Sequence, residues 1–200
     1  EIAIDVALRS RSISHLFVNT DSDEIENLAS SIDPALPVRR PDHLGNDEAP
    51  VTDVIFWTVE NFIANSRQIP DFVITLQPTS PFRTPELIDE AVSLLKHCPR
   101  ADSVISLVRV EHSPYKMRVL EGGYSRAFMG TRNVLQRQDA PETFRFTGNI
   151  FLTRTDFLMS SRQLWGDKSI PLIEAETVGF NIDSQLDFEI AEFLYSKKLT

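Results

Sequence analysis

Apolar runs of two kinds alternate along the chain. Short runs bounded by polar or turn-forming residues predict buried strands at 15–19, 72–76, 103–108 and 146–152, with a further strand near 177–182. Apolar residues at helical spacing predict helices at 23–31, 53–64, 85–97 and 186–194. Because strands and helices alternate, we expect βαβ units and a largely parallel sheet. The fold class is therefore α/β, a three-layer αβα sandwich with a mostly parallel, Rossmann-like sheet.

Residues 109–145 interrupt this alternation. They are polar and rich in turn residues, and 117–120 and 124–128 would pair as a hairpin around a Gly-Gly turn. A segment of this length is too long for an idle loop in a compact domain. We expect an arm or lid inserted into one domain that spans residues 1–200.

Composition narrows the class of partner. At 42% hydrophobic, 200 residues can bury one substantial core. A formal net charge of -9 disfavours nucleic acid or an anionic membrane as the main partner, because no basic stripe is available to neutralise phosphates. The longest apolar runs are too short to span a bilayer. The single cysteine, Cys98, cannot form an intrachain disulfide and suits the reducing cytoplasm.

The stretch at 76–83 is the most informative one, because a predicted buried strand runs directly into Leu-Gln-Pro-Thr-Ser-Pro-Phe-Arg. The two prolines remove backbone donors, so the chain cannot continue in a sheet ladder. Polar side chains are then presented at the carboxyl end of the strand, where open α/β sheets bind ligands. These side chains are Gln77, Thr79, Ser80 and Arg83. A simple turn before a helix capped by Thr84 explains the prolines but not this polar set.

The motif Gln-Pro-Thr-Ser-Pro-x-Arg resembles the signature of the CMP-N-acylneuraminate (CMP-sialic acid) synthetases, cytidylyltransferases that activate nine-carbon sugar acids. Further segments resemble the same family in the same order. They lie at 19–25, 40–47, 137–141, 148–151 and 181–187. The resemblance therefore extends over nearly the whole chain.

This resemblance implies a sheet of the nucleotide-diphospho-sugar transferase type, with 109–145 as an arm through which two subunits dimerise. The implied reaction is attack by the anomeric hydroxyl of a sugar acid on the α-phosphorus of CTP, with release of pyrophosphate. The implied partners are CTP, a nonulosonic (sialic-type) acid and a second copy of the chain. The family also has an N-terminal strand and a Gly-rich nucleotide loop, which we expect upstream of residue 1, with 1–8 as the helix that follows.

A divalent cation, Mg²⁺ or another, is expected because transfer at phosphorus requires charge neutralisation. Asp183 follows the predicted strand at 177–182 and would lie beside Gln77. The family pattern there is Asp-Ile-Asp, whereas this chain has Asn181, whose neutral carbonyl oxygen would hold the metal more weakly or through water. Asp187 fits the same pattern, but with Ser184 it also resembles a helix capping box.

The resemblance places nucleotide contacts at Arg40, Asp21 and Asp47. Alternatives remain open for each residue. Arg39 lies next to Arg40, Asp21 could cap the following helix, and Asp47 could cap the helix after it.

Expected sugar contacts are cations, amides and hydroxyls, which suit a carboxylate and many hydroxyl groups. They are Gln77, Thr79, Ser80, Lys116, Arg137, Arg145, Thr147 and Asn149. Of the site residues, Asp183, Gln77 and Arg137 are expected to be catalytic. The family has Asn-Gly-Ala at 147–149, so the exchange here leaves the particular sugar open. His43 and His112 lack clustered metal-ligating partners and are expected to be neither zinc ligands nor bases.

Two alternatives to a CMP-nonulosonate synthetase stay open. One is a related sugar nucleotidyltransferase, such as a CMP-3-deoxy-manno-octulosonate synthetase-like enzyme. The other is a catalytically silent dimeric relative that binds sugar or nucleotide. A glycosyltransferase is disfavoured, because the 76–83 motif does not belong to the usual pattern of that class.

Overall fold

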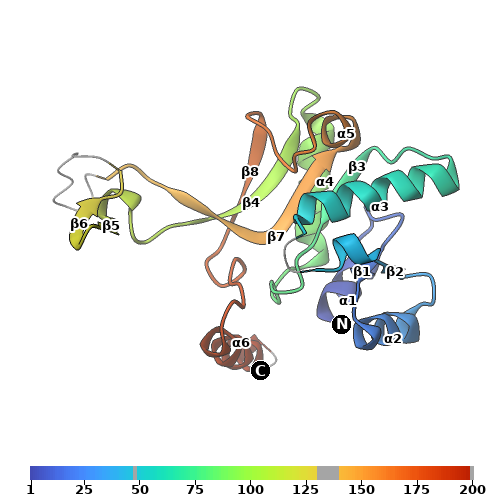
Figure 1. Cartoon of the computed structure of the whole chain (residues 1–200), viewed down its shortest axis with the longest axis horizontal. Helices are drawn as coiled ribbons and strands as arrows, with labels where there is room; N and C mark the ends of the chain where they lie inside the picture. Colours follow the sequence, from blue (N-terminus) through green and yellow to red (C-terminus); the bar gives the residue numbers. More distant parts are fainter. Residues whose placement is uncertain (47–48, 130–139, 199–200) are drawn as a thin grey trace.

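A four-stranded sheet forms the centre of the protein (Figure 1). The structure, a computed structural model, describes residues 1–46, 49–129 and 140–198. In spatial order the strands are β3 (Phe72–Thr75), β7 (Phe144–Arg154), β4 (Ser103–Arg109) and β8 (Ser169–Glu174). β4 and β8 are parallel, and β7 is antiparallel to both β3 and β4. Three strands therefore share one direction, as the sequence predicts, and β7 lies among them in the opposite one.

Helices cover both faces of this sheet, which confirms the three-layer α/β architecture. α1 (Ile2–Arg9) and α4 (Pro85–His97) pack on one face around Ile88, Leu95 and Leu152. α3 (Val51–Ser66) and α5 (Thr155–Ser161) pack on the other around Val59 and Leu158. Consecutive residues of β3 alternate between these cores, since Ile74 joins the first and Val73 the second.

Local signals fix the ends of α4. The Thr84 hydroxyl accepts a hydrogen bond from Leu87 N, and Pro85 occupies the first helical position. At the other end, Arg154 of β7 donates hydrogen bonds to the carbonyls of Leu95 and Cys98. The predicted bounds of this helix, 85–97, are confirmed.

A second, two-stranded parallel sheet consists of β1 (Val18–Thr20) and β2 (Pro37–Arg39). α2 (Asp23–Ile32) connects the two strands. Because the strands are parallel, both carboxyl ends lie at the same edge of this small sheet.

The segment predicted to be an arm contains a β-hairpin. β5 (Arg118–Glu121) and β6 (Tyr124–Ala127) are antiparallel, and the turn between them uses positive φ angles of 59° at Gly122 and 80° at Gly123. The short helix η2 (Pro114–Lys116) precedes the hairpin. Figure 1 shows the hairpin at the far end of β4 and β7, away from the helices. The predicted hairpin is confirmed, while dimerisation through it stays a prediction.

The prediction of a strand near 177–182 is wrong. The strand in this part of the chain is β8, and residues 175–183 form a turn and an irregular segment before α6 (Gln185–Lys198). β8 tolerates Pro171 because it is an edge strand. Within this irregular segment, Gly179 packs closely against Thr147, since a Cβ at position 179 would lie 2.7 Å from Thr147 Cγ2.

In the described part of the chain, no helix combines the length and apolar composition needed to cross a membrane.

Candidate active site

A bulge of four residues in β7 forms the floor of the candidate site. The pairing with β4 jumps from Ile105 opposite Phe151 to Leu107 opposite Phe146, so Ser106 alone faces residues 147–150. The Ser106 hydroxyl fills the gap: it accepts from Ile150 N at 2.9 Å and lies 2.6 Å from Thr147 Oγ1. Gly148 turns the backbone with φ 76°. Bulges of this kind often re-aim residues beside active sites.

The loop after β3 is fastened to this bulge. Ser80 Oγ donates to the Thr147 carbonyl at 3.3 Å, and Arg83 Nε donates to the Asn149 carbonyl at 2.7 Å. Arg83 Nη2 also donates to the Gln77 carbonyl at 2.8 Å. The loop is thereby held by side chains rather than by a β ladder.

Gln77 lies directly over the bulge. A Cβ atom at Gly148 would collide with Gln77 Oε1 and would lie 3.1 Å from Gln77 Cδ. The half-buried Gln77 side chain therefore occupies space that only a glycine at 148 leaves free.

The irregular segment before α6 joins the same cluster. Ile182 N donates to the Thr79 carbonyl at 2.9 Å, and Asn181 Oδ1 lies 3.2 Å from Ser80 Oγ. Asn181 Nδ2 donates to Asp183 Oδ1 at 2.8 Å, and Asp183 is exposed. Asp183 thus follows a residue that is bonded to the loop after Gln77, and this backbone bridge, not the end of a strand, fixes its position. That Asp183 lies beside Gln77 stays a prediction.

Asp187 serves as a helix cap. Ser184 Oγ donates to Asp187 Oδ2 at 2.7 Å, and Asp187 N lies 3.2 Å from Ser184 Oγ. The Ser184 hydroxyl, with backbone N–H groups nearby, holds the pKa of Asp187 below its ordinary value. The capping interpretation of Asp187 is confirmed.

A divalent cation would find the exposed Asp183 carboxylate here, whose Oδ1 also accepts from Asn181 Nδ2. No group of three or more His, Cys, Asp or Glu residues able to hold a metal occurs in the ranges 1–46, 49–129 and 140–198. Asn181 turns its amide nitrogen towards Asp183 and its oxygen towards Ser80, so its oxygen does not face the same point as the Asp183 carboxylate. Mg²⁺ is commonly held by one or two carboxylates together with substrate phosphates, and Asp183 fits one such ligand.

Thr147 and Asn149, predicted as sugar contacts, lie beneath the surface. Asn149 is 0% exposed, and its Nδ2 donates to Glu174 Oε2 at 2.9 Å and to the Val178 carbonyl at 2.8 Å. Thr147 is 2% exposed, and its hydroxyl contacts Ser106. The Asn149 amide nitrogen and the Thr147 hydroxyl are thus bonded to other parts of the protein.

Arg83 also departs from expectation. It is 3% exposed and points inward instead of being presented at the edge of the sheet. Burial lowers the pKa of Arg83 to about 10, and the nearby Glu174 carboxylate offsets this in part. Sequence reasoning missed Glu174, because its place under the bulge follows from β8, a strand that was not predicted.

Two further predicted sugar contacts are exposed cations. Lys116 is exposed at the end of η2, near the base of the hairpin. Arg145 is exposed on β7, with Nη1 donating to the Phe146 carbonyl at 3.3 Å. Arg137 lies outside the described residues.

The predicted nucleotide contacts gather at the edge of the small sheet. Arg40 follows β2 and donates from Nη2 to the Asn19 carbonyl at 3.1 Å, while its buried Nε has no partner among the described residues. Asp21 is exposed after β1 and lies against Gly45, where a Cβ would be 3.3 Å from Asp21 Cβ. The short helix η1 (Asp42–Leu44) closes this edge.

The alternatives for this group can now be narrowed. Arg39 forms exposed ion pairs with Asp23 and Glu26 of α2, which leaves Arg40 as the cation at the edge. Ser22, not Asp21, caps α2, since its hydroxyl accepts from the N–H of Ile25. Asp47 lies outside the described residues, but the N-cap residue of α3 is Pro50.

An aromatic cluster that the sequence did not predict lies beside the bulge. The ring centroids of Phe146, Phe151 and Trp165 are 5.0 to 6.1 Å apart, and Phe146 and Trp165 are 47% and 40% exposed. Trp165 lies in a loop without a periodic pattern of apolar residues, so the sequence pointed only to Phe146 and Phe151, which lie in the predicted strand. The cluster offers an apolar wall to a ligand.

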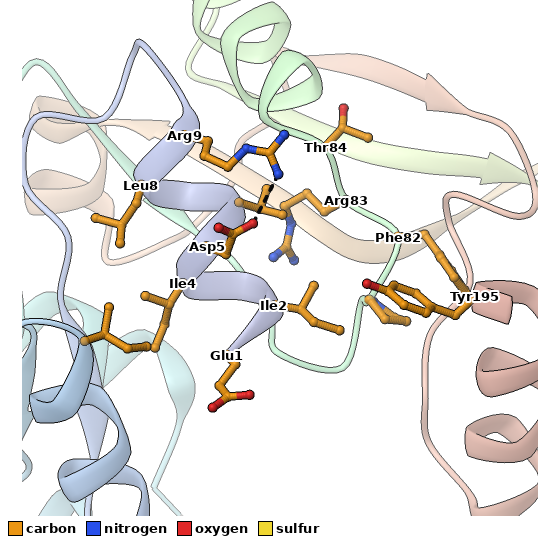
Figure 2. A pocket seen from close by; sticks show the side chains of 13 residues that line it. Glu1, Ile2, Ile4, Asp5, Leu8, Arg9, Phe82, Arg83, Thr84 and Tyr195 are labelled. Carbon is orange, nitrogen blue, oxygen red and sulfur yellow. Dashed lines mark hydrogen bonds and ion pairs between the residues drawn. The ribbon is translucent and has the colours of Figure 1, made fainter. Parts of the chain in front are cut away.

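A groove of about 640 Å³ lies elsewhere, between α1, the loop at 81–84 and Tyr195 of α6 (Figure 2). Its wall is mostly apolar, and residues such as Ile2, Leu8 and Phe82 contribute to it. Of the polar side chains predicted at 76–83, Arg83 lines it. Because Arg83 also binds the Gln77 carbonyl, the groove adjoins the polar cluster around Gln77.

Comparison with known proteins settles the family. Residues 1–198 match the family model described as cytidylyltransferase. The chain belongs to the cytidylyltransferase family. This confirms the predicted resemblance and makes the protein a nucleotidyltransferase.

Curated relatives of this cytidylyltransferase are moderately similar. The chain is 29% identical to post-translational flagellin modification protein B of Campylobacter coli, covering 96% of this chain and 81% of the relative. It is 27% identical to the CMP-N,N'-diacetyllegionaminic acid synthase of Campylobacter jejuni, with the same coverage. It is 26% identical to the N-acylneuraminate cytidylyltransferase of Escherichia coli, covering 98% of this chain and 45% of the relative.

Solved structures support the fold of the cytidylyltransferase. The structure of CMP:2-keto-3-deoxy-manno-octonic acid synthetase complexed with CTP has a TM-score of 0.67 at 14% identity, covering 98% of this chain and 87% of that one. A 4-diphosphocytidyl-2C-methyl-D-erythritol synthase from Anaerococcus prevotii also scores 0.67, at 13% identity, with 98% and 84% coverage. At these identities the likeness confirms the fold class alone.

Proposed function

We propose that this chain transfers CMP from CTP to the anomeric hydroxyl of a nonulosonic, sialic-type sugar acid and releases pyrophosphate. The observation that carries the proposal is the junction of three segments: the Gln77 loop, the β7 bulge and the segment ending at Asp183, joined by side-chain and backbone hydrogen bonds. Relatives named as CMP-legionaminic acid and N-acylneuraminate enzymes support the same substrate class.

We assign each site residue a role according to its charge and its position. Asp183 would hold a divalent cation together with phosphate oxygens of CTP, and that cation would neutralise charge that develops during transfer. Gln77, whose amide both donates and accepts hydrogen bonds, would orient sugar hydroxyls. Arg40 and Asp21 would hold the nucleotide at the edge of the small sheet. Arg137 is proposed as a catalytic cation near the phosphates.

The sugar carboxylate requires a cationic partner. Lys116 and Arg145 are exposed cations at the base of the arm and on β7. We assign them to this role, Lys116 because it matches a family position and Arg145 because it is a cation of the same kind on β7. Thr79 and Ser80 would act through the loop, since the Thr79 carbonyl and the Ser80 side chain already bind other segments. Thr147 and Asn149 would shape the sugar site from below.

The aromatic cluster favours an acylated sugar over a plainer acid. Phe146 and Trp165 present exposed ring surface beside the bulge, and acyl substituents offer apolar groups to such a surface. A CMP-3-deoxy-manno-octulosonate synthetase-like activity is the second candidate, supported by the likeness in fold to the CTP-bound synthetase.

The assembly is proposed to be a cytoplasmic homodimer. The hairpin exposes large apolar residues, with Leu120 85% and Tyr124 74% exposed, as expected of a surface that a partner covers. The single cysteine suits a reducing compartment.

Pyrophosphate release tests the proposal. The chain is assayed with CTP, Mg²⁺ and a panel of sialic, legionaminic, pseudaminic and 3-deoxy-manno-octulosonic acids. Release with one nonulosonic acid that disappears in Asp183→Ala supports the proposal. Release only with the octulosonic acid supports the second candidate. If the folded chain releases none with any acid, the assay is repeated on the complete coding sequence, and no release there either supports the silent binding relative.

A further inference from the structure

Arg83 joins two segments of the candidate site that lie far apart in sequence. Its Nε donates to the Asn149 carbonyl at 2.7 Å, and its Nη2 donates to the Gln77 carbonyl at 2.8 Å. The guanidinium therefore holds the backbone of Gln77 itself at a fixed place relative to the bulge. A planar fork with fixed donor directions suits this double contact better than an ammonium group.

Asn149 extends the link to a third segment. While its carbonyl accepts from Arg83, its side-chain amide donates to Glu174 Oε2 at 2.9 Å. Glu174 ends β8 and is 7% exposed. Three neighbouring parts of the sheet, the loop after β3, the bulge of β7 and the end of β8, are thus connected through Arg83, Asn149 and Glu174.

Burying this hydrogen-bonded network costs more free energy than a purely structural role would require. Burying charged groups is costly, and apolar side chains of similar size often stabilise a core as well or better. Three atoms of the network, Arg83 Nη1, Asn149 Oδ1 and Glu174 Oε1, are buried without a hydrogen-bond partner among the described residues. The arrangement fixes directions more than it maximises stability.

Arg154 also binds backbone carbonyls with its guanidinium, but it does so away from the candidate site. It lies at the other end of β7 and donates to backbone carbonyls of Ala101 and Leu95, both at 2.8 Å. Its partners hold the end of α4, on the opposite side of the sheet's length from Gln77. Arg154 therefore provides a matched control for what a half-buried arginine contributes to stability alone.

From this geometry we propose that Arg83, backed by Asn149 and Glu174, is a positioning residue that sets the place of Gln77 for the sugar acid. The proposal rests on the proposed function, in which Gln77 contacts sugar hydroxyls. Arg83 itself touches no substrate in this role and acts through the Gln77 backbone.

The kinetic test compares Arg83→Lys with Arg154→Lys in the full chain. Arg83→Lys keeps the charge but cannot reach both carbonyls with the same geometry. We expect the KM for the sugar acid to rise about 10- to 100-fold, because small misplacements near the reacting groups cost about that much, with the KM for CTP changed less than about twofold. Arg154→Lys should leave both KM values unchanged. An unchanged KM for the sugar acid in folded Arg83→Lys overturns the proposal.

Hydrogen exchange supplies a readout that does not depend on activity. In Arg83→Lys, the amides of 77–82 and 147–151 should exchange faster, and in Arg154→Lys only those near 95–102 should do so. If neither the wild-type chain nor the complete coding sequence releases pyrophosphate with any acid, the proposed function fails, and exchange still decides whether Arg83 holds Gln77. Unchanged exchange at 77–82 overturns the positioning role. Glu174→Gln, which keeps an acceptor for Asn149, should show a smaller change at the same amides if Arg83→Lys proves too unstable to study.

Discussion

Gln77 rests on Gly148, and the two residues are so close that a methyl group at position 148 has no room beside the Gln77 amide oxygen. One residue belongs to the loop after β3 and the other to the bulge of β7. The positive φ of Gly148, 76°, adds a second reason why this position needs glycine.

Gly148→Ala should therefore impair the site more than backbone strain alone explains. Strain at a positive φ costs about 1–3 kcal/mol, and displacement of Gln77 adds to it. Gly123→Ala is the control, because Gly123 has a φ of 80° but nothing within 4 Å of its Cβ position. Urea denaturation and the KM for the sugar acid check the pair. Equal effects of the two variants on both quantities would contradict the predicted contact.

Ser106→Ala should open the bulge. The Ser106 hydroxyl is the acceptor for Ile150 N and the partner of the Thr147 hydroxyl, so its removal leaves buried polar groups unpaired, at a cost of about 1–3 kcal/mol. Ser103→Ala on the same strand is the control, because its partner, the Ser169 hydroxyl, also donates to the Gly166 carbonyl. The free energy of unfolding should fall more in Ser106→Ala. The reverse order would show that the bulge does not depend on this hydroxyl.

Glu174 should make stability depend on pH. Burial raises the pKa of Glu174 above its ordinary 4.5, although hydrogen bonds from Asn149 and Thr147 and the charge of Arg83 offset this in part. The folded state then binds the Glu174 proton more tightly than the unfolded state, so this residue adds stability as the pH falls through the folded pKa towards 4.5.

Glu174→Gln cannot titrate and removes this dependence. The free energy of unfolding of the wild type minus that of the variant should therefore increase as the pH falls from about 7 to about 5, measured by urea denaturation. A difference that decreases over this range would mean that the pKa of Glu174 is lowered, not raised.

The two acids near the start of α6 should separate in function. Asp183→Ala should abolish pyrophosphate release while changing stability little, because its carboxylate is exposed. Asp187→Ala should lower the free energy of unfolding, because its carboxylate accepts from Ser184 Oγ, and should leave release per folded molecule close to the wild type. Release assays at saturating CTP, together with thermal unfolding of both variants, test this. Loss of release in folded Asp187→Ala would assign Asp187 to the metal instead.

Local signals predicted most of the fold. The bounds of α4 follow from Thr84, Pro85 and the spacing of Ile88 and Leu95, all within one helix. The hairpin between β5 and β6 follows from its two glycines. Such elements carry their information in adjacent residues, which is why sequence patterns find them.

The missed features depend on partners distant in sequence. β8 contains Pro171 and forms only because β4 pairs with one of its edges. The inward direction of Arg83 depends on the Asn149 carbonyl, which lies in the bulge 66 positions later. The choice between Arg39 and Arg40 depends on α2, whose acids engage Arg39. Patterns confined to one segment cannot encode these contacts.

β7 has a consequence for how the arm and the site behave together. The same strand begins at Phe144, where the chain returns from the arm, and passes under Gln77 at Gly148 four residues later. A pull, a twist or a partner that displaces the hairpin therefore acts on the strand that also forms the floor of the site. The arm and the floor of the site are continuous through β7, so a change in the position of one is transmitted to the other.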